Sequence, residues 1–432
     1  MTVGRWGLGM VIAIGVQARA MADEAAIALP PPERTDPVTL GLMQGFPPPP
    51  DKVVTLANTL KFPNGRWAFH HLRALGPTAN VARGALPPSA LPSAPRPLDE
   101  VALTDAKGLS TTIAQWQSAT YTDALLVLHR GKVVYEKYYV GMLAEEPHVL
   151  WSTTKSFTGL LAAMLINEGK LDPQATIATY VPELAASAWG DATLQQTLDM
   201  TTAVQYREDY TDPKSPLFQY ARAAGLIPAP AGDGGPHALF DYLRTLRKDG
   251  EHGAGFVYKS VDTEVVGLVL QRVTAKSYAE LAAERIWRPL GAEQDAYVWV
   301  DPVGMAVTSI GLNATLRDLA RFGEMLRNDG KVDGREVVPK AAIEAIRRGA
   351  DREKFKASGL TERFGYSYHD NWWIAHDTDG SFEAKGLNGQ HIHINPAAEL
   401  VIVKLSSHPL GNTIHTHTID RRAFAAIAGA VR

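Results

Sequence analysis

The stretch Ser152-Thr153-Thr154-Lys155 opens a segment that continues to Gly169. Apolar residues recur through it at helical spacing: Phe157, Leu160, Leu161, Met164 and Leu165. This periodicity predicts one face of an amphipathic helix, and Gly169 is placed to end it. Ser152 therefore starts a buried helix, and Lys155 lies one turn further along the same side.

A serine hydroxyl becomes a strong nucleophile only when a base takes its proton, and an amine one turn away can be that base. The amine must first be neutral, so we expect burial or a nearby cation to lower the pKa of Lys155. The N-terminus of the helix adds positive potential and free N–H groups, which suit acyl transfer. The alternative interpretation of Ser152 and Lys155 is a helix cap followed by a solvated lysine.

Composition excludes several classes of function. The 432 residues are 45% hydrophobic and 21% charged, which is ordinary for a soluble globular protein of one large or two modest domains. The net charge is −3 and no basic stripe is present, so a nucleic-acid partner is not expected. The absence of cysteine excludes disulfides, thiolate metal sites and a cysteine nucleophile.

The first 22 residues resemble a cleavable signal peptide. Arg5 precedes an apolar run from Gly7 to Val16, and Ala20-Met21-Ala22 gives a small-x-small cleavage pattern. The run is too short to span a bilayer. We therefore expect export to the periplasm or the medium and no membrane span. The alternative is an apolar start on a cytoplasmic protein.

The rest of the chain divides into a proline-rich extension, residues 23–100, and a body, residues 101–432. In the body, residues 125–140 predict a hairpin, and strands are predicted at 372–376, 389–394 and 400–406. Helical patterns fill the region between, notably 261–273, 277–287 and 315–328. We therefore expect an α/β (α+β) fold. Its antiparallel sheet is built from both ends of the catalytic region, flanked by helices, with a helical insertion.

Two further segments could complete a catalytic site. Among the 14 tyrosines, only Tyr258 is followed two residues later by Ser or Asn, here Ser260. A phenol beside an ammonium can lose its proton more easily, so Tyr258 could relay a proton. Lys385 to Gln390 precedes the last hairpin, and its glycines would let a substrate approach the strand edge. The alternatives are a buried loop tyrosine and an ordinary turn.

The Ser-x-x-Lys, Tyr-x-Ser and glycine-containing strand elements occur in an order that resembles the serine β-lactamase and penicillin-binding-protein superfamily. Four further stretches resemble its 6-aminohexanoate-dimer hydrolase (nylon-oligomer hydrolase) branch: residues 207–213, 240–246, 317–321 and 401–407. The resemblance covers residues 120 to 432. It implies a β-lactamase/transpeptidase-like fold and a serine hydrolase that cleaves small amides or esters, with carboxylesterase activity, without a cofactor.

Residue by residue, the resemblance implies Ser152 as nucleophile, Lys155 as general base and Tyr258 as proton relay. The backbone N–H groups of Ser152 and Leu387 would form the oxyanion hole. The residues expected to contact substrate are Tyr210, Ser260, Ser309, Asn388 and Gln390.

Three positions depart from the branch pattern. Ala221 and Ser309 stand where the hydrolase of the linear dimer has an acidic residue and an asparagine, and Asn388 stands where a threonine or histidine is expected. We therefore expect short-chain ester hydrolysis to exceed dimer hydrolysis. Other hypotheses are a β-lactamase or D-alanyl-D-alanine carboxypeptidase and a catalytically silent penicillin-recognising module. An α/β-hydrolase is excluded because no Gly-x-Ser-x-Gly occurs.

Two histidine pairs could in principle chelate a metal, His391-x-His393 and His415-x-His417. No acidic segment accompanies them in the sequence, so we interpret them as structural or surface histidines and expect no metal. The expected partner is a small-molecule substrate, and the oligomeric state stays open.

Overall fold

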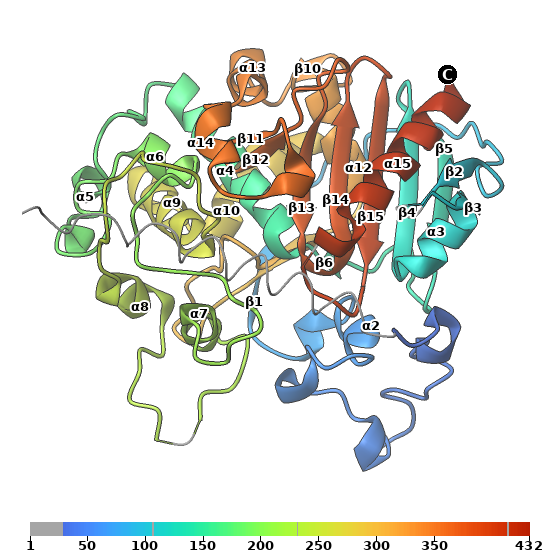
Figure 1. Cartoon of the computed structure of the whole chain (residues 1–432), viewed down its shortest axis with the longest axis horizontal. Helices are drawn as coiled ribbons and strands as arrows, with labels where there is room; N and C mark the ends of the chain where they lie inside the picture. The colour runs from blue at the N-terminus through green and yellow to red at the C-terminus, as the bar shows by residue number, and fades with distance from the viewer. Residues whose placement is uncertain (1–28, 106–107, 231, 413) are drawn as a thin grey trace, which may run out of the picture.

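The computed structural model describes residues 29–105, 108–230, 232–412 and 414–432 (Figure 1). Its main sheet has seven strands, each antiparallel to its neighbour, in the order β11-β12-β13-β14-β15-β4-β5. Their bounds, in chain order, are β4 Thr122–His129, β5 Lys132–Tyr138, β11 Ser367–His369, β12 Trp372–Ile374, β13 Phe382–Gly386, β14 Gln390–Asn395 and β15 Leu400–Ser406. The prediction of one antiparallel sheet built from both ends of the body is confirmed.

The join between the two ends of the body is the pairing of β15 with β4, which runs from Leu400↔His129 to Ser406↔Thr122. Every residue of both strands is buried. Such continuous burial requires cover on both faces of the sheet, which explains the nearly unbroken apolar run of β4.

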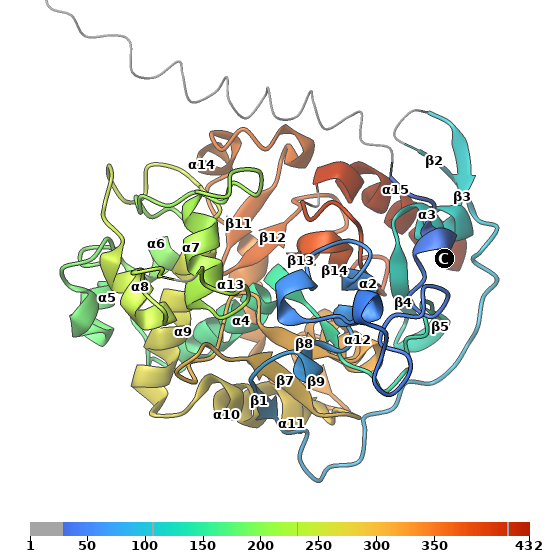
Figure 2. The same cartoon turned by 90° about the horizontal axis from the view of Figure 1, so that it is seen from below.

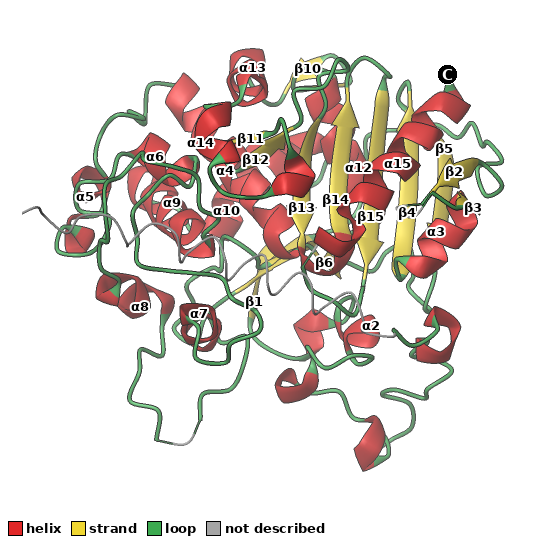
Figure 3. Ribbon diagram, in the orientation of Figure 1, coloured by secondary structure: helices red, strands yellow, loops and turns green. Residues whose placement is uncertain are grey.

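Helices supply that cover (Figures 2 and 3). On one face, α12 (Leu316–Arg327) packs against β4, β14 and β15. On the other face lie α15 (Ile414–Val431) and α3 (Ile113–Ala119), where Trp116 meets Phe424 edge to face.

The predicted helical insertion lies between β5 and β11. Its α-helices, besides α12, are α4 Thr154–Asn167, α5 Ile177–Tyr180, α6 Leu194–Leu198, α7 Pro216–Ala223, α8 Leu239–Thr245, α9 Ser260–Thr274, α10 Tyr278–Ala282, α11 Arg288–Leu290, α13 Lys340–Arg348 and α14 Arg352–Lys356. The insertion also contributes to a four-stranded sheet in the order β1-β7-β8-β6, with the bounds β1 Thr78–Val81, β6 His148–Val149, β7 Ala296–Trp299 and β8 Leu312–Ala314. It also contains the hairpin of β9 (Lys331–Val332) and β10 (Arg335–Glu336).

The helix predicted after Ser152 is present, but it is not amphipathic. Ser152 lies in a 3-10 turn, Trp151–Thr153, that leads directly into α4. Residues 154–165 are all buried, so the helix has no solvent face before its last turn. Its small and polar residues pack against other elements: at Gly159 an added Cβ would lie 1.9 Å from the carbonyl oxygen of Asp370. Close packing on every side therefore replaces the predicted amphipathic pattern.

The proline-rich extension shares the core of the body. After short 3-10 turns and α2 (Gly65–Ala68), its strand β1 (Thr78–Val81) pairs with β7 (Ala296–Trp299). Its buried side chains belong to the main core, among them Phe69 and Leu72. The predicted signal peptide, residues 1–22, lies outside the described residues. Among the helices that are described, none combines the length and apolarity needed to cross a membrane.

Candidate active site

Ser152 and Lys155 meet in a buried pocket of hydrogen-bond acceptors. Lys155 Nζ donates to Ser152 Oγ at 2.9 Å, to Ser260 Oγ at 2.9 Å and to the carbonyl oxygen of Ser309 at 3.3 Å. Ser260 is the first residue of α9, so two helix starts face each other across this amine. No carboxylate is among these three contacts, and the neighbours that Lys155 touches are therefore neutral.

The electrostatic surroundings of Lys155 bring the pKa of its amine close to physiological pH. Its side chain is fully buried, and burial lowers its pKa to about 8. The carboxylates of Glu208 and Glu264 act in the opposite direction but do not overcome desolvation. A lysine of this kind exchanges a proton readily at pH 7 to 8.

Tyr258 is adjacent to the same pair, and it is held by aromatic packing. Lys155 Nζ lies 5.0 Å from its ring centre, and the ring stacks on Trp373 at 5.6 Å. Burial and the charge of Glu208 raise the pKa of Tyr258, although a hydrogen bond with Ser152 partly opposes them. The expectation that Tyr258 loses its proton more easily is thus wrong for the free protein, because desolvation outweighs the hydrogen bond with Ser152 and the charge of Arg363.

Ser152 and Tyr258 open into a cavity of about 400 Å³. Apolar and aromatic side chains form much of its wall, and charged groups stand at intervals around it. The lining residues are Ser152, Arg207, Glu208, Tyr210, Gly255, Phe256, Val257, Tyr258, Ala357, Ser358, Leu360, Arg363, Trp373, Lys385, Gly386, Leu387 and Asn412. The size and lining suit a small organic substrate.

The end of β13 reaches the Ser152 turn because residue 386 is glycine. A Cβ on Gly386 would lie 2.2 Å from the carbonyl oxygen of Leu150, two residues before Ser152. Without that side chain the strand passes close to the Ser152 turn, and Leu387 lines the cavity together with Ser152. This proximity places the two predicted oxyanion-hole residues at the same cavity.

Of the five residues expected to contact substrate, only Tyr210 lines the cavity. Ser260 is buried beneath Lys155. Ser309 is fully buried, with its hydroxyl 2.9 Å from that of Tyr220. Asn388 has a φ of 59° and donates to the carbonyl of His408.

Gln390 donates to the carbonyls of Leu387 and Ser406. The amide groups of Asn388 and Gln390 therefore hold the turn that carries Leu387, instead of pointing to a substrate. Ala221, in α7, is also not among the cavity-lining residues.

A sequence profile of the beta-lactamase family matches residues 109–427. The chain belongs to the beta-lactamase family. It is 36% identical over 370 residues to the 6-aminohexanoate-dimer hydrolase of Paenarthrobacter ureafaciens, covering 85% of this chain and 91% of that relative. It is thus a beta-lactamase-superfamily hydrolase that resembles 6-aminohexanoate-dimer hydrolase, as the sequence motifs predicted.

Solved structures of the beta-lactamase fold agree. A Bacillus anthracis protein provisionally assigned as a 6-aminohexanoate-dimer hydrolase superposes with a TM-score of 0.80 at 32% identity, covering 89% of this chain and 98% of that one. A family VIII carboxylesterase superposes with a TM-score of 0.53 at 18% identity, covering 72% and 95%. The similarity to the carboxylesterase concerns the fold alone.

Glu208 is a site residue of this family member that sequence reasoning missed. Its Oε1 accepts the backbone N–H of Ser260 at 2.6 Å, and its Oε2 accepts the hydroxyl of Tyr210 at 2.9 Å. It therefore connects the Tyr210 loop to the start of α9, whose Ser260 holds Lys155. Glu208 was part of the stretch resembling the branch, but nothing in the sequence alone showed that its carboxylate reaches Ser260.

A buried acid also lies beneath Lys155. Glu264 accepts from the hydroxyl of Tyr220 at 2.7 Å and from the backbone N–H groups of Thr308 and Ser309 at 2.8 and 3.1 Å. This network fixes the carbonyl of Ser309 that accepts from Lys155. Two acidic residues directly before the apolar run of α9, Asp262 and Glu264, were the available signal, because a buried carboxylate needs such partners.

Two of the histidines considered for metal binding, His391 and His393, lie beside carboxylates on the α15 face of the sheet. His393 Nδ1 lies 2.8 Å from Glu383 Oε1, and His391 Nε2 lies 3.4 Å from Asp420 Oδ2. Both rings are buried, so the surface interpretation is wrong for them. Among the described residues, the groups whose atoms could converge on a metal lie elsewhere.

Proposed function

We propose that this protein is a serine hydrolase that cleaves small amide or ester bonds through an acyl-enzyme on Ser152, with carboxylesterase activity. The observation that carries the proposal is the contact of 2.9 Å between Lys155 Nζ and Ser152 Oγ, with the lysine buried and its pKa lowered to about 8. A base of that strength beside a serine hydroxyl is what acyl transfer needs near pH 8.

Acylation begins when neutral Lys155 takes the Ser152 proton and Oγ bonds to the substrate carbonyl carbon. The carbonyl oxygen becomes an oxyanion, which the backbone N–H groups of Ser152 and Leu387 stabilise. When the intermediate collapses, the bond to the leaving amine or alkoxide breaks. Tyr258, which is protonated in the free protein, gives its proton to the leaving group, and the protonated Lys155 replaces that proton.

Deacylation reverses these roles with water as the nucleophile. Water loses a proton to the regenerated base, attacks the acyl carbon and releases the acid, while Oγ of Ser152 regains its proton. Because Lys155 and Tyr258 exchange protons within one site, the pH dependence belongs to the pair.

The cavity supports small substrates with an apolar acyl part. Aromatic rings of Phe256, Tyr258 and Trp373 line it. Ala221, where the resemblance places an acidic residue, lies in α7 outside this lining and carries no charge for a distant ammonium. We expect short-chain esters to be cleaved faster than the linear 6-aminohexanoate dimer, since unmatched polar contacts cost about 1–3 kcal/mol each. β-Lactam and D-alanyl-D-alanine substrates are disfavoured, because the ammonium of Lys385 is already paired with Glu383 and cannot act as a free carboxylate partner.

A fluorophosphonate reagent tests the nucleophile. The intact protein should gain one adduct, mass spectrometry should place it on the peptide containing Ser152, and Ser152→Ala should abolish it. Labelling of another residue would contradict the proposal. No labelling of the folded protein would favour the silent binding module.

A substrate panel tests the specificity. We expect kcat/KM for p-nitrophenyl butyrate to exceed that for the linear dimer, and Ala221→Asp to shift the ratio toward the dimer. Ala221→Asn has similar size without charge and is the matched control. A wild-type preference for the dimer would show that another residue supplies the contact to the ammonium.

For localisation we propose export, with cleavage near Ala22, on the residue pattern of the first 22 residues. N-terminal sequencing of the protein from its native host tests this, and an uncleaved cytoplasmic protein would contradict it.

A further inference from the structure

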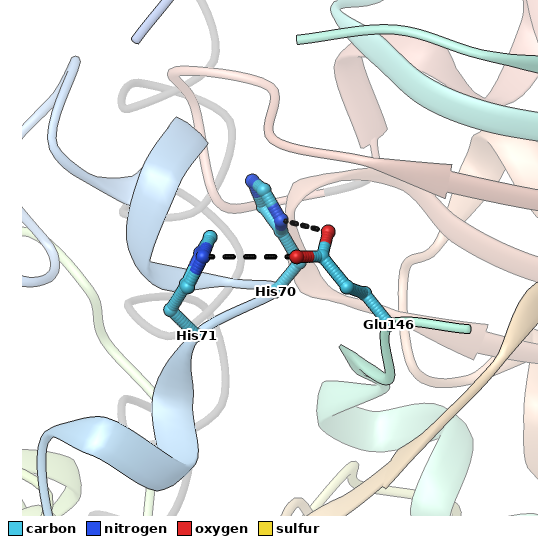
Figure 4. Close-up of side chains that lie close together, drawn as sticks. All are labelled: His70, His71 and Glu146. Atoms are coloured by element: carbon cyan, nitrogen blue, oxygen red, sulfur yellow. Dashed lines mark hydrogen bonds and ion pairs between the residues drawn. The ribbon is translucent and has the colours of Figure 1, made fainter. Parts of the chain in front are cut away.

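We propose that His70, His71 and Glu146 form a binding site for a divalent zinc-like cation, separate from the catalytic cavity. The three side chains come from two segments about 75 positions apart in the sequence and converge on one point (Figure 4). One ligand atom from each lies within 4.8 Å of the others. Two histidines and a glutamate are a ligand set that zinc uses in proteins, with the fourth position left to water.

The two distances within the group differ, because one is that of a hydrogen bond and the other is not. His70 Nδ1 lies 3.0 Å from Glu146 Oε2, and His71 Nε2 lies 3.8 Å from Glu146 Oε1. Two ligands that are each about 2.0–2.1 Å from a tetrahedral zinc are about 3.3 Å apart. The second distance is too long for an N–H···O hydrogen bond, so a proton on His71 does not explain the approach of this ring to the carboxylate.

The orientation of His71 is fixed in the way that metal-binding histidines usually are. Its Nδ1 lies 2.9 Å from the carbonyl oxygen of Trp67, which can only accept, so Nδ1 carries the hydrogen. In the neutral ring the lone pair of Nε2 then faces Glu146. A ring N–H given to a backbone carbonyl, with the other nitrogen directed at the metal, is the common outer-shell arrangement. The ring of Trp67 also stacks on His71 at 4.2 Å.

A second cluster of histidine and carboxylate side chains differs from this group in the charge of its histidine. His369 lies between Asp199 and Asp370, with its two nitrogens 2.8 and 3.5 Å from their carboxylates. These carboxylates raise its pKa to about 9, so the ring itself carries the positive charge. His71 has a carbonyl on one side in place of a carboxylate, which leaves its second nitrogen free to bind a metal.

The site would connect the N-terminal extension to the segment that leads to Ser152. The histidines follow Phe69, whose carbonyl accepts the N–H of Val149 at 2.8 Å and whose ring packs on Trp151. Glu146 lies just before Val149. Side chains of His71 and Glu146 are 31% and 24% exposed, so a cation has a path from solvent. A bound metal would therefore stabilise this junction, and none of its three ligands lines the catalytic cavity.

Titration of the full-length protein, freed of metal with a chelator, tests the site with zinc chloride as the probe. We expect one zinc per chain by calorimetry and a rise in Tm of about 2–4 °C at a zinc concentration of about 100 Kd. His71→Ala and Glu146→Gln should each weaken binding by at least about tenfold. The neighbouring exposed acid gives the matched control, Glu145→Gln, which should bind as the wild type does.

Circular dichroism without zinc shows whether each variant is folded. If Glu146→Gln does not fold, His71→Ala carries the test, because His71 is the more exposed side chain. Absence of zinc binding to the wild-type protein would overturn the proposal. Binding that is unchanged in both variants would overturn it as well, since it would place the cation at other residues.

Discussion

Lys155 and Lys385 are both buried at the active site, and burial lowers the pKa of each to about 8, yet their neighbours differ in kind. Lys155 touches two hydroxyls and a carbonyl. Lys385 contacts the carboxylate of Glu383 directly, and His417 Nδ1 lies 3.0 Å away.

In the proposed mechanism this difference separates a general base, Lys155, from a structural cation, Lys385. The pKa of Glu383 is held well below its usual range, with Lys385 the largest favourable cause, so the pair stays charged. Lys155 has no carboxylate in contact to hold its proton. A buried lysine becomes a general base when its partners are neutral groups that can exchange a proton.

The largest effect should come from Lys155→Met, which keeps the volume but removes the amine. We expect kcat/KM for p-nitrophenyl butyrate to fall by about 10³-fold or more, because Ser152 loses its base. The fold, checked by circular dichroism, should persist. Activity within tenfold of the wild type would break the comparison, since another group would then accept the serine proton.

We expect Lys385→Met to lower the stability of the fold and not to disturb the proton transfer of the reaction. Removing one partner of a buried ion pair costs about 3–5 kcal/mol. We expect the lower end because Arg421 still neutralises Glu383 and His393 Nδ1 still lies 2.8 Å from its carboxylate. Urea unfolding measures the loss. The double variant with Glu383→Gln should recover part of it. A midpoint of the pH–rate profile that moves in Lys385→Met would show that Lys385 takes part in the proton transfer after all.

The pH–rate profile of the wild type sharpens the comparison further. Lys155 must be neutral to act, and its pKa is lowered from 10.5 to about 8, so kcat/KM should rise tenfold per pH unit below 8 and level off above it. The raised pKa of Tyr258 means that its proton is retained, so no decline is expected near pH 10. A bell-shaped pH–rate profile in which kcat/KM already declines below pH 9 would contradict the assignment of Tyr258 as a proton donor.

The smallest effect is expected for Glu208→Gln. Its negative charge raises the pKa of Lys155, so removing it should move the rising limb to lower pH, by about half a pH unit for charges near a solvated cavity. Asp209→Asn removes a charge from the same loop and is the control. The Asp209 carboxylate accepts from the N–H and the hydroxyl of Thr211, and its own N–H donates to Ser215 Oγ. If the midpoint of the pH–rate profile shifts equally in both variants, the overall charge of the loop sets that midpoint, and the contact of Glu208 with Ser260 does not.

The local parts of the site were predictable, and the distant ones were not. A spacing of three residues placed Ser152 and Lys155 on one side of a helix, and the sequence order of three motifs indicated the family. The contact of Glu208 with Ser260 depends on where a long loop returns, and no local pattern encodes that. The same holds for the pairing of β1 with β7, and for the acids beside His391 and His393. The amphipathic pattern after Ser152 was misleading because its polar residues pack against neighbouring elements of the same chain.

The pairing of β4 with β15 has a consequence for biosynthesis. Thr122 and its partner Ser406 are 284 positions apart, so at 5–20 residues per second the first strand waits roughly 15–60 s for its neighbour to leave the ribosome. Until then the β4–β5 hairpin has an unpaired edge and apolar residues on both faces, which is a template for aggregation. Yield of folded protein should therefore depend on growth temperature and on chaperones that shield this hairpin during translation.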